Sequence, residues 1–303
     1  MDEQQPVGQN TETTPFFRKD GLRILDIGNS YTDDATALLP LLVKEAKVDL
    51  KGMSLYKAVR GGASFKSWCD VYNDQDESSY KVSRVVGDSD SKVPTGTGTK
   101  NDGDLFRRLV TDVKWDLIFI HQFSRYAPYY DVWKTEGDGG HLEELLAILK
   151  KHQPDARIGF LLIHSYSSDY SGNKEKSSLE RWKLISESVG RLCEEYGIEY
   201  VIPYGTAIQN LRSSSLNDEY DLTRDGSHCG IGLCRYAAAC CYYESIIAPR
   251  TGISVLGNPA RFDAPVNPSF NSSIDVTDDN AHIAQKAAIM ACKDWFNCLD
   301  PVK

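Results

Sequence analysis

Short apolar runs that alternate with longer amphipathic segments are the feature that most constrains the fold of this chain. The runs are rich in aliphatic and β-branched residues, and they predict five strands, at 22–28, 50–59, 116–122, 157–165 and 199–205. Strands that read as nearly continuous hydrophobic runs are buried on both faces, as in a parallel sheet. The alternation therefore predicts an α/β fold in which helices cover both faces of the sheet.

Apolar residues at helical spacing fill the segments between and after these strands. The segments with this spacing are 33–47, 141–152, roughly 176–196, 231–247 and 278–298. Asp33 and Asp34 open the first of them, where carboxylates complement the positive end of the helix dipole. Because crossovers between parallel strands are right-handed, we predict one three-layer α/β/α sandwich with a five-stranded parallel sheet.

Two segments do not follow this alternation of strands and helices. Residues 73–103 are rich in Asp, Ser, Gly and Thr and are predicted to form a long loop, which in a compact domain is functional or disordered. Residues 250–277 carry Pro, Asn and Gly and predict an irregular path. We expect a flexible tail over 1–20, one domain over 21–250, and a C-terminal extension over 251–303 that packs on the same domain.

The charge balance and the first residues bear on partners and location. The chain has 34 Lys and Arg against 43 Asp and Glu, a net charge of -9, which disfavours nucleic acid as a partner. No apolar stretch approaches the ~20 residues that span a bilayer. Residues 1–20 lack the apolar core of a signal peptide. We expect an exported protein whose leader was replaced by Met1, and a cytosolic protein with a loose start is the alternative.

The cysteines predict neither a disulfide scaffold nor a metal site. Eight Cys in 303 residues are too sparse for such a scaffold. No CxxC is present, and Cys229 and Cys234 have no matching pair or His cluster downstream. Cys240 and Cys241 are expected to be small buried thiols, and a disulfide that involves Cys292 or Cys298 is a secondary alternative.

One serine follows the first predicted strand. Gly28, Asn29 and Ser30 place the Ser30 hydroxyl between a strand end and a helix N-terminus. In open α/β sheets, ligands bind at the carboxyl ends of the strands. Ser30 is therefore a candidate nucleophile, and the alternative is an ordinary capping or turn serine.

Asp225 and His228 lie three residues apart on a short turn that contains Gly226. A nucleophilic serine needs a base within hydrogen-bond reach, and the base needs an acceptor that fixes its tautomer. This turn supplies both groups, although each residue alone is equally typical of a turn or a cap. Together with Ser30, the pair predicts a Ser-His-Asp triad.

In its order of motifs the chain resembles the SGNH/GDSL hydrolase family over roughly residues 20–250. The first block of that family looks like Gly28 to Tyr31, and the last block, Asp-x-x-His, matches Asp225 to His228. The resemblance implies a flavodoxin-like fold and no metal or cofactor. It implies catalytic roles for Ser30, Asp225 and His228. The second block looks like Gly62, whose N–H would join that of Ser30 in an oxyanion hole, although Gly61 is also possible.

The third block departs from the usual family pattern. Where most members have Asn, the third strand here runs into His121 and Gln122. The pattern is similar to a branch common in glycan-degrading gut bacteria, which has a Gln-Gln-x-Ser type sequence. Gln122 offers the same amide on a longer stem, and we expect it to be the third oxyanion donor. His121 is the alternative, although strand alternation sends it to the opposite face.

The segment 124–133 is rich in aromatic residues near the predicted crevice. We expect Arg125, Tyr129, Trp133 and His164 to contact substrate, while about half of the aromatic residues in this region pack into the core. Polar aromatic walls favour a carbohydrate ester. The predicted function is therefore a serine esterase that removes an acyl group, expected to be acetyl, from a small or oligomeric sugar. The alternatives are a lipid or thioester hydrolase on the same triad, and a non-catalytic glycan-binding protein. Oligomeric state stays open.

Overall fold

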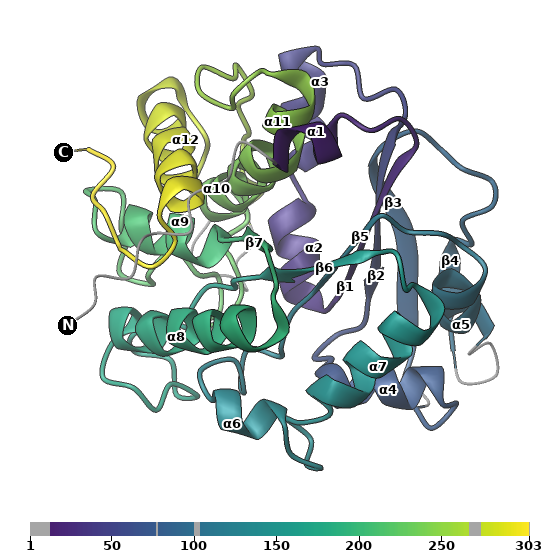
Figure 1. The fold of residues 1–303 in the computed structure, drawn as a ribbon. Coiled ribbons are helices and arrows are strands. Elements are labelled where there is room, and N and C mark those ends of the chain that lie inside the picture. The colour runs from purple at the N-terminus through teal and green to yellow at the C-terminus, as the bar shows by residue number, and fades with distance from the viewer. Residues whose placement is uncertain (1–12, 77, 100–103, 267–273, 303) are drawn as a thin grey trace.

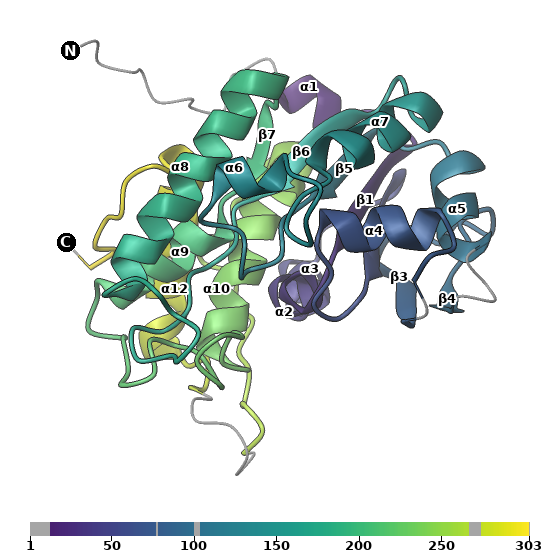
Figure 2. The same ribbon diagram turned by 90° about the horizontal axis from the view of Figure 1, so that it is seen from below.

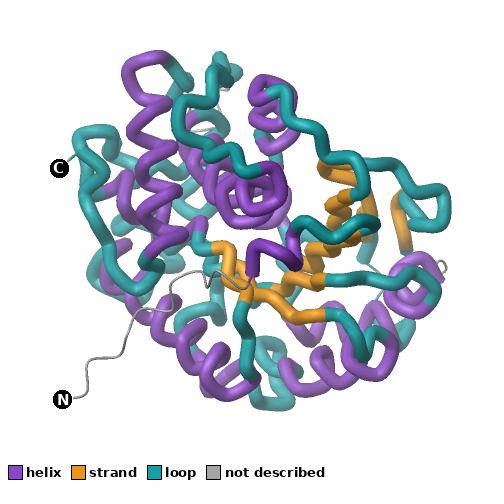
Figure 3. Tube along the Cα trace, turned by 45° about the horizontal axis from the view of Figure 1, so that its top comes forward, coloured by secondary structure: helices purple, strands orange, loops and turns teal. Residues whose placement is uncertain are grey.

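A seven-stranded sheet forms the centre of the computed structural model, which describes residues 13–76, 78–99, 104–266 and 274–302. The strand order is β4-β3-β2-β1-β5-β6-β7. The strands are β1 (Leu22–Gly28), β2 (Met53–Val59), β3 (Tyr80–Gly87), β4 (Gly96–Gly98), β5 (Leu117–Ile120), β6 (Arg157–Leu161) and β7 (Tyr200–Ile202). Figure 3 shows the strands enclosed by helices and loops.

The five predicted strands are the parallel part of this sheet. β1 pairs in parallel with β2 and β5, and β5 and β6 continue the parallel pairing to β7. Taken alone, these five strands have the spatial order second, first, third, fourth, fifth, which is the flavodoxin-like order. The predicted α/β class is confirmed, and the carboxyl end of β1 lies at the switch point of the sheet.

The predicted count of five strands is corrected to seven. β3 and β4 lie within the segment that was predicted to be a long loop, and they add an antiparallel edge next to β2. The missed signal is the alternation from Tyr80 to Ser83, where the buried apolar residues Tyr80 and Val82 alternate with less buried polar residues. This alternation is typical of a strand that is covered on one face only.

Helices cover both faces of the sheet. In Figures 1 and 2, α2, α3 and α10 lie on one face and α4, α7 and α8 on the other. The helices on the first face and at its margins are α1 (Thr13–Phe17), α2 (Ser30–Thr36), α3 (Leu39–Ala46), α9 (Tyr204–Arg212), α10 (Leu233–Tyr242), the π-helix η2 (Tyr243–Ile247), α11 (Ala248–Thr251) and α12 (Asp278–Lys293). The remaining helices are α4 (Phe65–Tyr72), α5 (Asp104–Thr111), α6 (Tyr130–Trp133), α7 (Leu142–His152) and α8 (Ser178–Tyr196).

The ends of the chain differ in part from the prediction. Within the predicted tail over 1–20, residues 13–17 form α1, and Phe17 is buried with its ring 5.7 Å from that of Tyr200. The first twelve residues lie outside the described residues. At the other end, α12 packs against α9 and α10. Within the described ranges, none of the helices combines the length and the hydropathy that crossing a bilayer requires.

A buried carboxyl group in β1 makes stability depend on pH. Asp26 is fully buried; its Oδ2 accepts a hydrogen bond from the Tyr242 hydroxyl at 2.9 Å, while its Oδ1 has no partner. Burial raises the pKa of Asp26 to about 7, against the opposing effects of Tyr242 and Lys57. Because this pKa exceeds that of an unfolded Asp, the folded state loses stability as pH rises toward 7.

Asp26→Asn is therefore expected to stabilise the protein at pH 8. The amide is neutral at every pH, and its oxygen still accepts from Tyr242. A shift of about 3 pKa units corresponds to at most about 4 kcal/mol, so we expect a gain of about 1–4 kcal/mol at pH 8 that vanishes near pH 4. Urea unfolding of both proteins between pH 4 and 8 measures this. Parallel stability curves would contradict it.

Candidate active site

The turn between β1 and α2 presents Ser30 at the carboxyl end of the central strand. Asn29 has extended backbone angles and caps α2, since its Oδ1 accepts from the Tyr31 N–H at 3.0 Å. Only glycine fits at Gly28, because a Cβ there would lie 2.1 Å from Oγ1 of Thr32 and 2.2 Å from Nε2 of His121. Ser30 itself is half-buried, with its hydroxyl free of any capping role.

The imidazole of His121 holds this turn through hydrogen bonds. Its Nδ1 lies 3.0 Å from the Gln122 carbonyl oxygen, so Nδ1 carries the hydrogen. Nε2 then accepts from the Asn29 N–H at 3.3 Å and from the Thr32 hydroxyl at 2.9 Å. Burial lowers the pKa of His121 to about 4, against the hydrogen bond to Gln122, so the ring is neutral at physiological pH. Both ring nitrogens are therefore already engaged, Nδ1 by the Gln122 carbonyl and Nε2 by the turn that carries Ser30.

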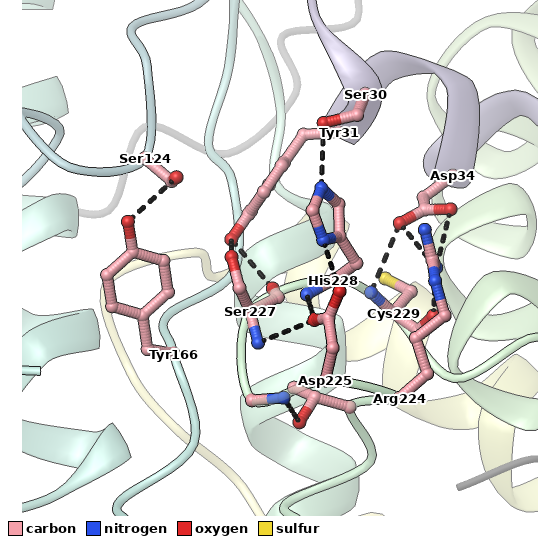
Figure 4. Close-up of polar contacts among 12 residues, drawn as sticks. Ser30, Tyr31, Asp34, Ser124, Tyr166, Arg224, Asp225, Ser227, His228 and Cys229 are labelled. Atoms are coloured by element: carbon pink, nitrogen blue, oxygen red, sulfur yellow. Dashed lines mark hydrogen bonds and ion pairs between the residues drawn. The ribbon is translucent and has the colours of Figure 1, made fainter. Parts of the chain in front are cut away.

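The loop that carries Asp225 and His228 reaches Ser30 from the far end of the chain. The Ser30 Oγ lies 2.9 Å from Nε2 of His228, and Nδ1 of His228 lies 2.7 Å from Oδ2 of Asp225 (Figure 4). The other oxygen, Oδ1, accepts from the backbone N–H groups of Ser227 at 3.0 Å and of His228 at 2.7 Å. Gly226 allows this tight turn with a φ of +81°.

The charge of Asp225 determines the tautomer of the imidazole. Partial burial opposes ionisation, but the hydrogen bonds from the side chain and the backbone of His228 outweigh it and lower the pKa of Asp225 below its usual range. A carboxylate can only accept, so Nδ1 of His228 carries the hydrogen. Nε2 is then free to accept the Ser30 hydroxyl proton. The three predicted residues thus have the geometry of a Ser-His-Asp triad.

Tyr31 and His164 hold the middle of the loop. Both donate to the Ser227 carbonyl oxygen, from the Tyr31 hydroxyl at 2.7 Å and from Nε2 of His164 at 2.8 Å. Their rings stack with centroids 4.4 Å apart. His164 is 1% exposed, its Nε2 is used by the Ser227 carbonyl and its ring stacks on Tyr31, so its polar and stacking contacts are made within the protein and not to a ligand. This placement corrects the expectation that His164 contacts substrate.

The two other predicted oxyanion donors lie in different environments. Gly62 has a φ of +66° in an exposed turn, and the Asn29 amide holds this turn by donating to the Ala63 carbonyl at 2.9 Å. Gln122 is buried; its Nε2 donates to the Gly139 carbonyl at 2.8 Å, and its Oε1 accepts from the N–H of Phe123. Nε2 of Gln122 therefore retains one further hydrogen.

Of the residues in segment 124–133 that were predicted to contact substrate, two are accessible at the surface and one is buried in the core. Arg125 is exposed, and Tyr129 is half-buried with its hydroxyl donating to Glu175 at 2.7 Å. Trp133 is fully buried, stacked on Phe160 at 5.6 Å, so it belongs to the core and not to a ligand-binding wall. Trp133 is thus a second correction to the predicted set.

In the part of the chain that the structure describes, no group of three or more His, Cys, Asp or Glu side chains is arranged so that it could hold a metal ion. The eight cysteines are free thiols. The sulfur atoms of Cys241 and Cys292 lie 3.5 Å apart between α10 and α12.

Comparison with known proteins gives a family and a fold. Residues 23–282 match the family described as "Domain of unknown function (DUF4886)". A crystal structure of a DUF4886 family protein from Bacteroides uniformis is 24% identical, with a TM-score of 0.64 over 90% of this chain and 94% of that chain. This likeness shows a shared fold. No curated protein matches the chain.

Two further solved structures are more distant. A gut microbial diltiazem-metabolizing enzyme is 12% identical, with a TM-score of 0.40 over 77% of this chain and 47% of that chain. Phospholipase A1 from Streptomyces albidoflavus is 11% identical, with a TM-score of 0.39 over 76% of this chain and 99% of that chain.

Proposed function

The chain belongs to the DUF4886 family, and we propose that it is a serine esterase with Ser30 as nucleophile, His228 as general base and Asp225 as the group that orients the base. The observation that carries this proposal is a chain of two hydrogen bonds. The first joins Ser30 Oγ to His228 Nε2, and the second joins His228 Nδ1 to Asp225. A half-exposed serine at a strand end, bonded to an imidazole that is itself fixed by a carboxylate, suits nucleophilic acyl transfer.

In the proposed reaction, Oγ of Ser30 attacks the ester carbonyl carbon while Nε2 of His228 takes the hydroxyl proton. The carbonyl electron pair moves to oxygen, and a tetrahedral intermediate forms. Its collapse breaks the bond to the alcohol oxygen, which receives the proton from His228 and leaves. Water, deprotonated by His228, then attacks the acyl-serine; the bond to Ser30 Oγ breaks, Oγ takes the proton back from His228, and the acid is released. Asp225 stays ionised and stabilises the imidazolium.

The oxyanion of this intermediate needs hydrogen-bond donors. We propose the N–H groups of Ser30 and Gly62, with the second amide hydrogen of Gln122. The link from Asn29 to Ala63 supports this arrangement, because it joins the nucleophile turn to the Gly62 turn. Gln122 is already held by Gly139 and Phe123, so its amide is preorganised and does not have to move during the reaction.

Gln122→Ala is expected to lower kcat about 10²–10³-fold, the usual cost of removing one oxyanion donor. KM should stay within about threefold, because the lost hydrogen bond is made mainly in the transition state. The measurement is hydrolysis of p-nitrophenyl acetate, with kcat divided by the concentration of titrated active sites to correct for misfolded protein. A normalised kcat within about threefold of wild type would remove Gln122 from the proposed oxyanion hole.

For the substrate, we propose an O-acetyl ester on a carbohydrate. Arg125 and Tyr129 support this choice, because an exposed guanidinium and a half-exposed phenol offer polar and stacking contacts to a sugar ring. Release of acetate from a panel of acetylated polysaccharides tests it, with Ser30→Ala as the control. A preference for esters with acyl chains longer than about eight carbons would favour a lipid hydrolase. Failure to react with a fluorophosphonate probe would favour a non-catalytic binding protein.

A further inference from the structure

We propose that Asp34 is a positioning residue whose buried carboxylate keeps the loop of Asp225 and His228 in register with the helix of Ser30. The inference rests on the proposed function. Asp34 lies in α2, four residues after Ser30 and thus about 6 Å further along the same helix. Its side chain is 1% exposed. A carboxylate so deeply buried is stable only when cations and hydrogen-bond donors compensate it.

Two arginines and one backbone N–H surround this carboxylate. Nη1 of Arg224 lies 2.9 Å from each oxygen of Asp34. Arg235, from α10, donates to Oδ1 through Nε at 2.9 Å and Nη2 at 2.6 Å. The N–H of Cys229 donates to Oδ2 at 3.1 Å. Asp34 therefore joins α2, α10 and the loop, and Figure 4 shows Cys229 and Arg224 reaching its carboxylate from the loop of Asp225 and His228.

The loop partners of Asp34 stand at the two ends of the catalytic segment 225–228. Arg224 directly precedes this segment, and Cys229 directly follows it. The Arg224 N–H also donates to the His228 carbonyl oxygen at 3.0 Å, which closes the loop on itself. Both ends of the segment are thus tied to one carboxylate on the helix of the nucleophile, so a shift of the loop would require these charged hydrogen bonds to break.

One other charged contact joins the two ends of the segment, because the guanidinium of Arg224 also donates to the Cys229 carbonyl oxygen, but this contact does not reach α2. Tyr31 and His164 hold only Ser227, in the middle of the segment. Replacing Asp34 by Asn keeps the size of the side chain and removes the charge, which leaves the guanidinium groups of Arg224 and Arg235 close together without their shared anion. We expect the loop to move, and a displacement of about 1 Å at reacting groups can lower a rate about 10²-fold.

The experiment compares wild type with Asp34→Asn, Arg224→Gln and the control Asp278→Asn. Asp278 loses an ion pair in the same substitution, but its partner is Arg261 at 2.8 Å and its side chain is 91% exposed. Three quantities are measured: kcat and KM for p-nitrophenyl acetate per titrated active site, the Tm, and the distance between Ser30 Oγ and His228 Nε2 in a crystal structure of each variant.

We expect Asp34→Asn to lower kcat per active site about 10–10²-fold, to leave KM within about threefold, and to lengthen the distance between Ser30 Oγ and His228 Nε2. Arg224→Gln should lower kcat and lengthen the distance between Ser30 Oγ and His228 Nε2 in the same way, again with KM within about threefold. If Asp34→Asn does not fold, Arg224→Gln tests the inference by itself. The control should behave like wild type. A variant with a lower Tm but an unchanged kcat per active site and an unchanged distance between Ser30 Oγ and His228 Nε2 would overturn the inference and leave a purely structural role.

Failure of the proposed function has a different signature. In that case wild type itself neither reacts with a fluorophosphonate nor hydrolyses the ester. The distance between Ser30 Oγ and His228 Nε2 then decides the positioning role alone, since it reports the register of the loop against α2 and does not require turnover. A distance in Asp34→Asn that stays at the 2.9 Å of the wild type overturns the inference, and a longer distance supports it.

Discussion

Ser30→Ala is expected to fold normally and to hydrolyse esters about 10⁶-fold more slowly than wild type, as loss of the nucleophile does in a comparable triad. The fold should survive because Asn29, and not Ser30, caps α2. The Ser30 hydroxyl contacts His228, so its removal takes away the attacking atom without taking away a structural hydrogen bond. The Tm should therefore stay close to that of wild type.

The measurement is initial-rate hydrolysis of p-nitrophenyl acetate together with labelling by a fluorophosphonate. Ser83→Ala is a matched control, because it makes the same chemical change on the antiparallel strand β3. This control should be labelled and active, whereas Ser30→Ala should be neither. Residual activity above about 1% of wild type in Ser30→Ala would assign the nucleophile to another residue.

Asp225→Asn is expected to lower kcat about 10⁴-fold while the loop keeps its shape. The Asn oxygen can still accept from the N–H groups of Ser227 and His228, so its NH₂ faces the imidazole. That NH₂ donates to Nδ1 and thereby favours the tautomer with hydrogen on Nε2, which can no longer accept the Ser30 proton. The loss should appear in kcat and little in KM.

Asp221→Asn is the matched control for this variant. Asp221 lies four residues earlier, but its carboxylate accepts from the N–H and the hydroxyl of Ser168 and not from an imidazole. Ester hydrolysis should be nearly unchanged in the control. If both variants lost activity equally, the effect would come from disturbance of the loop, and the role of Asp225 as the orienting group would be refuted.

The pH dependence of this interaction has a definite sign. The pKa of Asp225 is lowered in the folded protein, so the attraction between its carboxylate and His228 is present above the ordinary carboxyl range and is lost as pH falls below it. Asp26 behaves oppositely, because burial raises its pKa and its cost to stability grows as pH rises. The two groups act on different quantities, the orientation of the base and the stability of the fold.

The sequence by itself determined the elements whose signal is local. Continuous apolar runs identified the five parallel strands, because strands buried on both faces carry this pattern in a few consecutive residues. The segment 225–228 was recognisable because a base and its orienting carboxylate three residues apart can meet within one turn. Ser30 was recognisable from its place directly after the first strand, where the geometry of α/β sheets puts ligands.

Other elements had a local signal that neighbouring residues hid. The first four residues of β3 alternate between apolar and polar, but the polar residues around the strand favoured a loop. The predicted helix 33–47 is divided into α2 and α3, with Pro40 in the first turn of the second helix. Proline is well tolerated at a helix start and not in a helix interior. In both cases the sequence contained the signal. The polar residues around β3 masked the strand, and the apolar helical spacing over 33–47 masked the break at Pro40.

The tertiary structure alone decided which side chains face the site. Trp133 lies in the aromatic segment after β5 and His164 shortly after β6, yet contacts from distant segments bury both side chains. Asp34 reads as one of two acidic residues at a helix start, and only the fold brings it to Arg224 and Arg235, 190 and 201 residues away. The physical reason is that burial, ion pairing and hydrogen bonding of a side chain depend on its neighbours in space, which a local pattern does not specify.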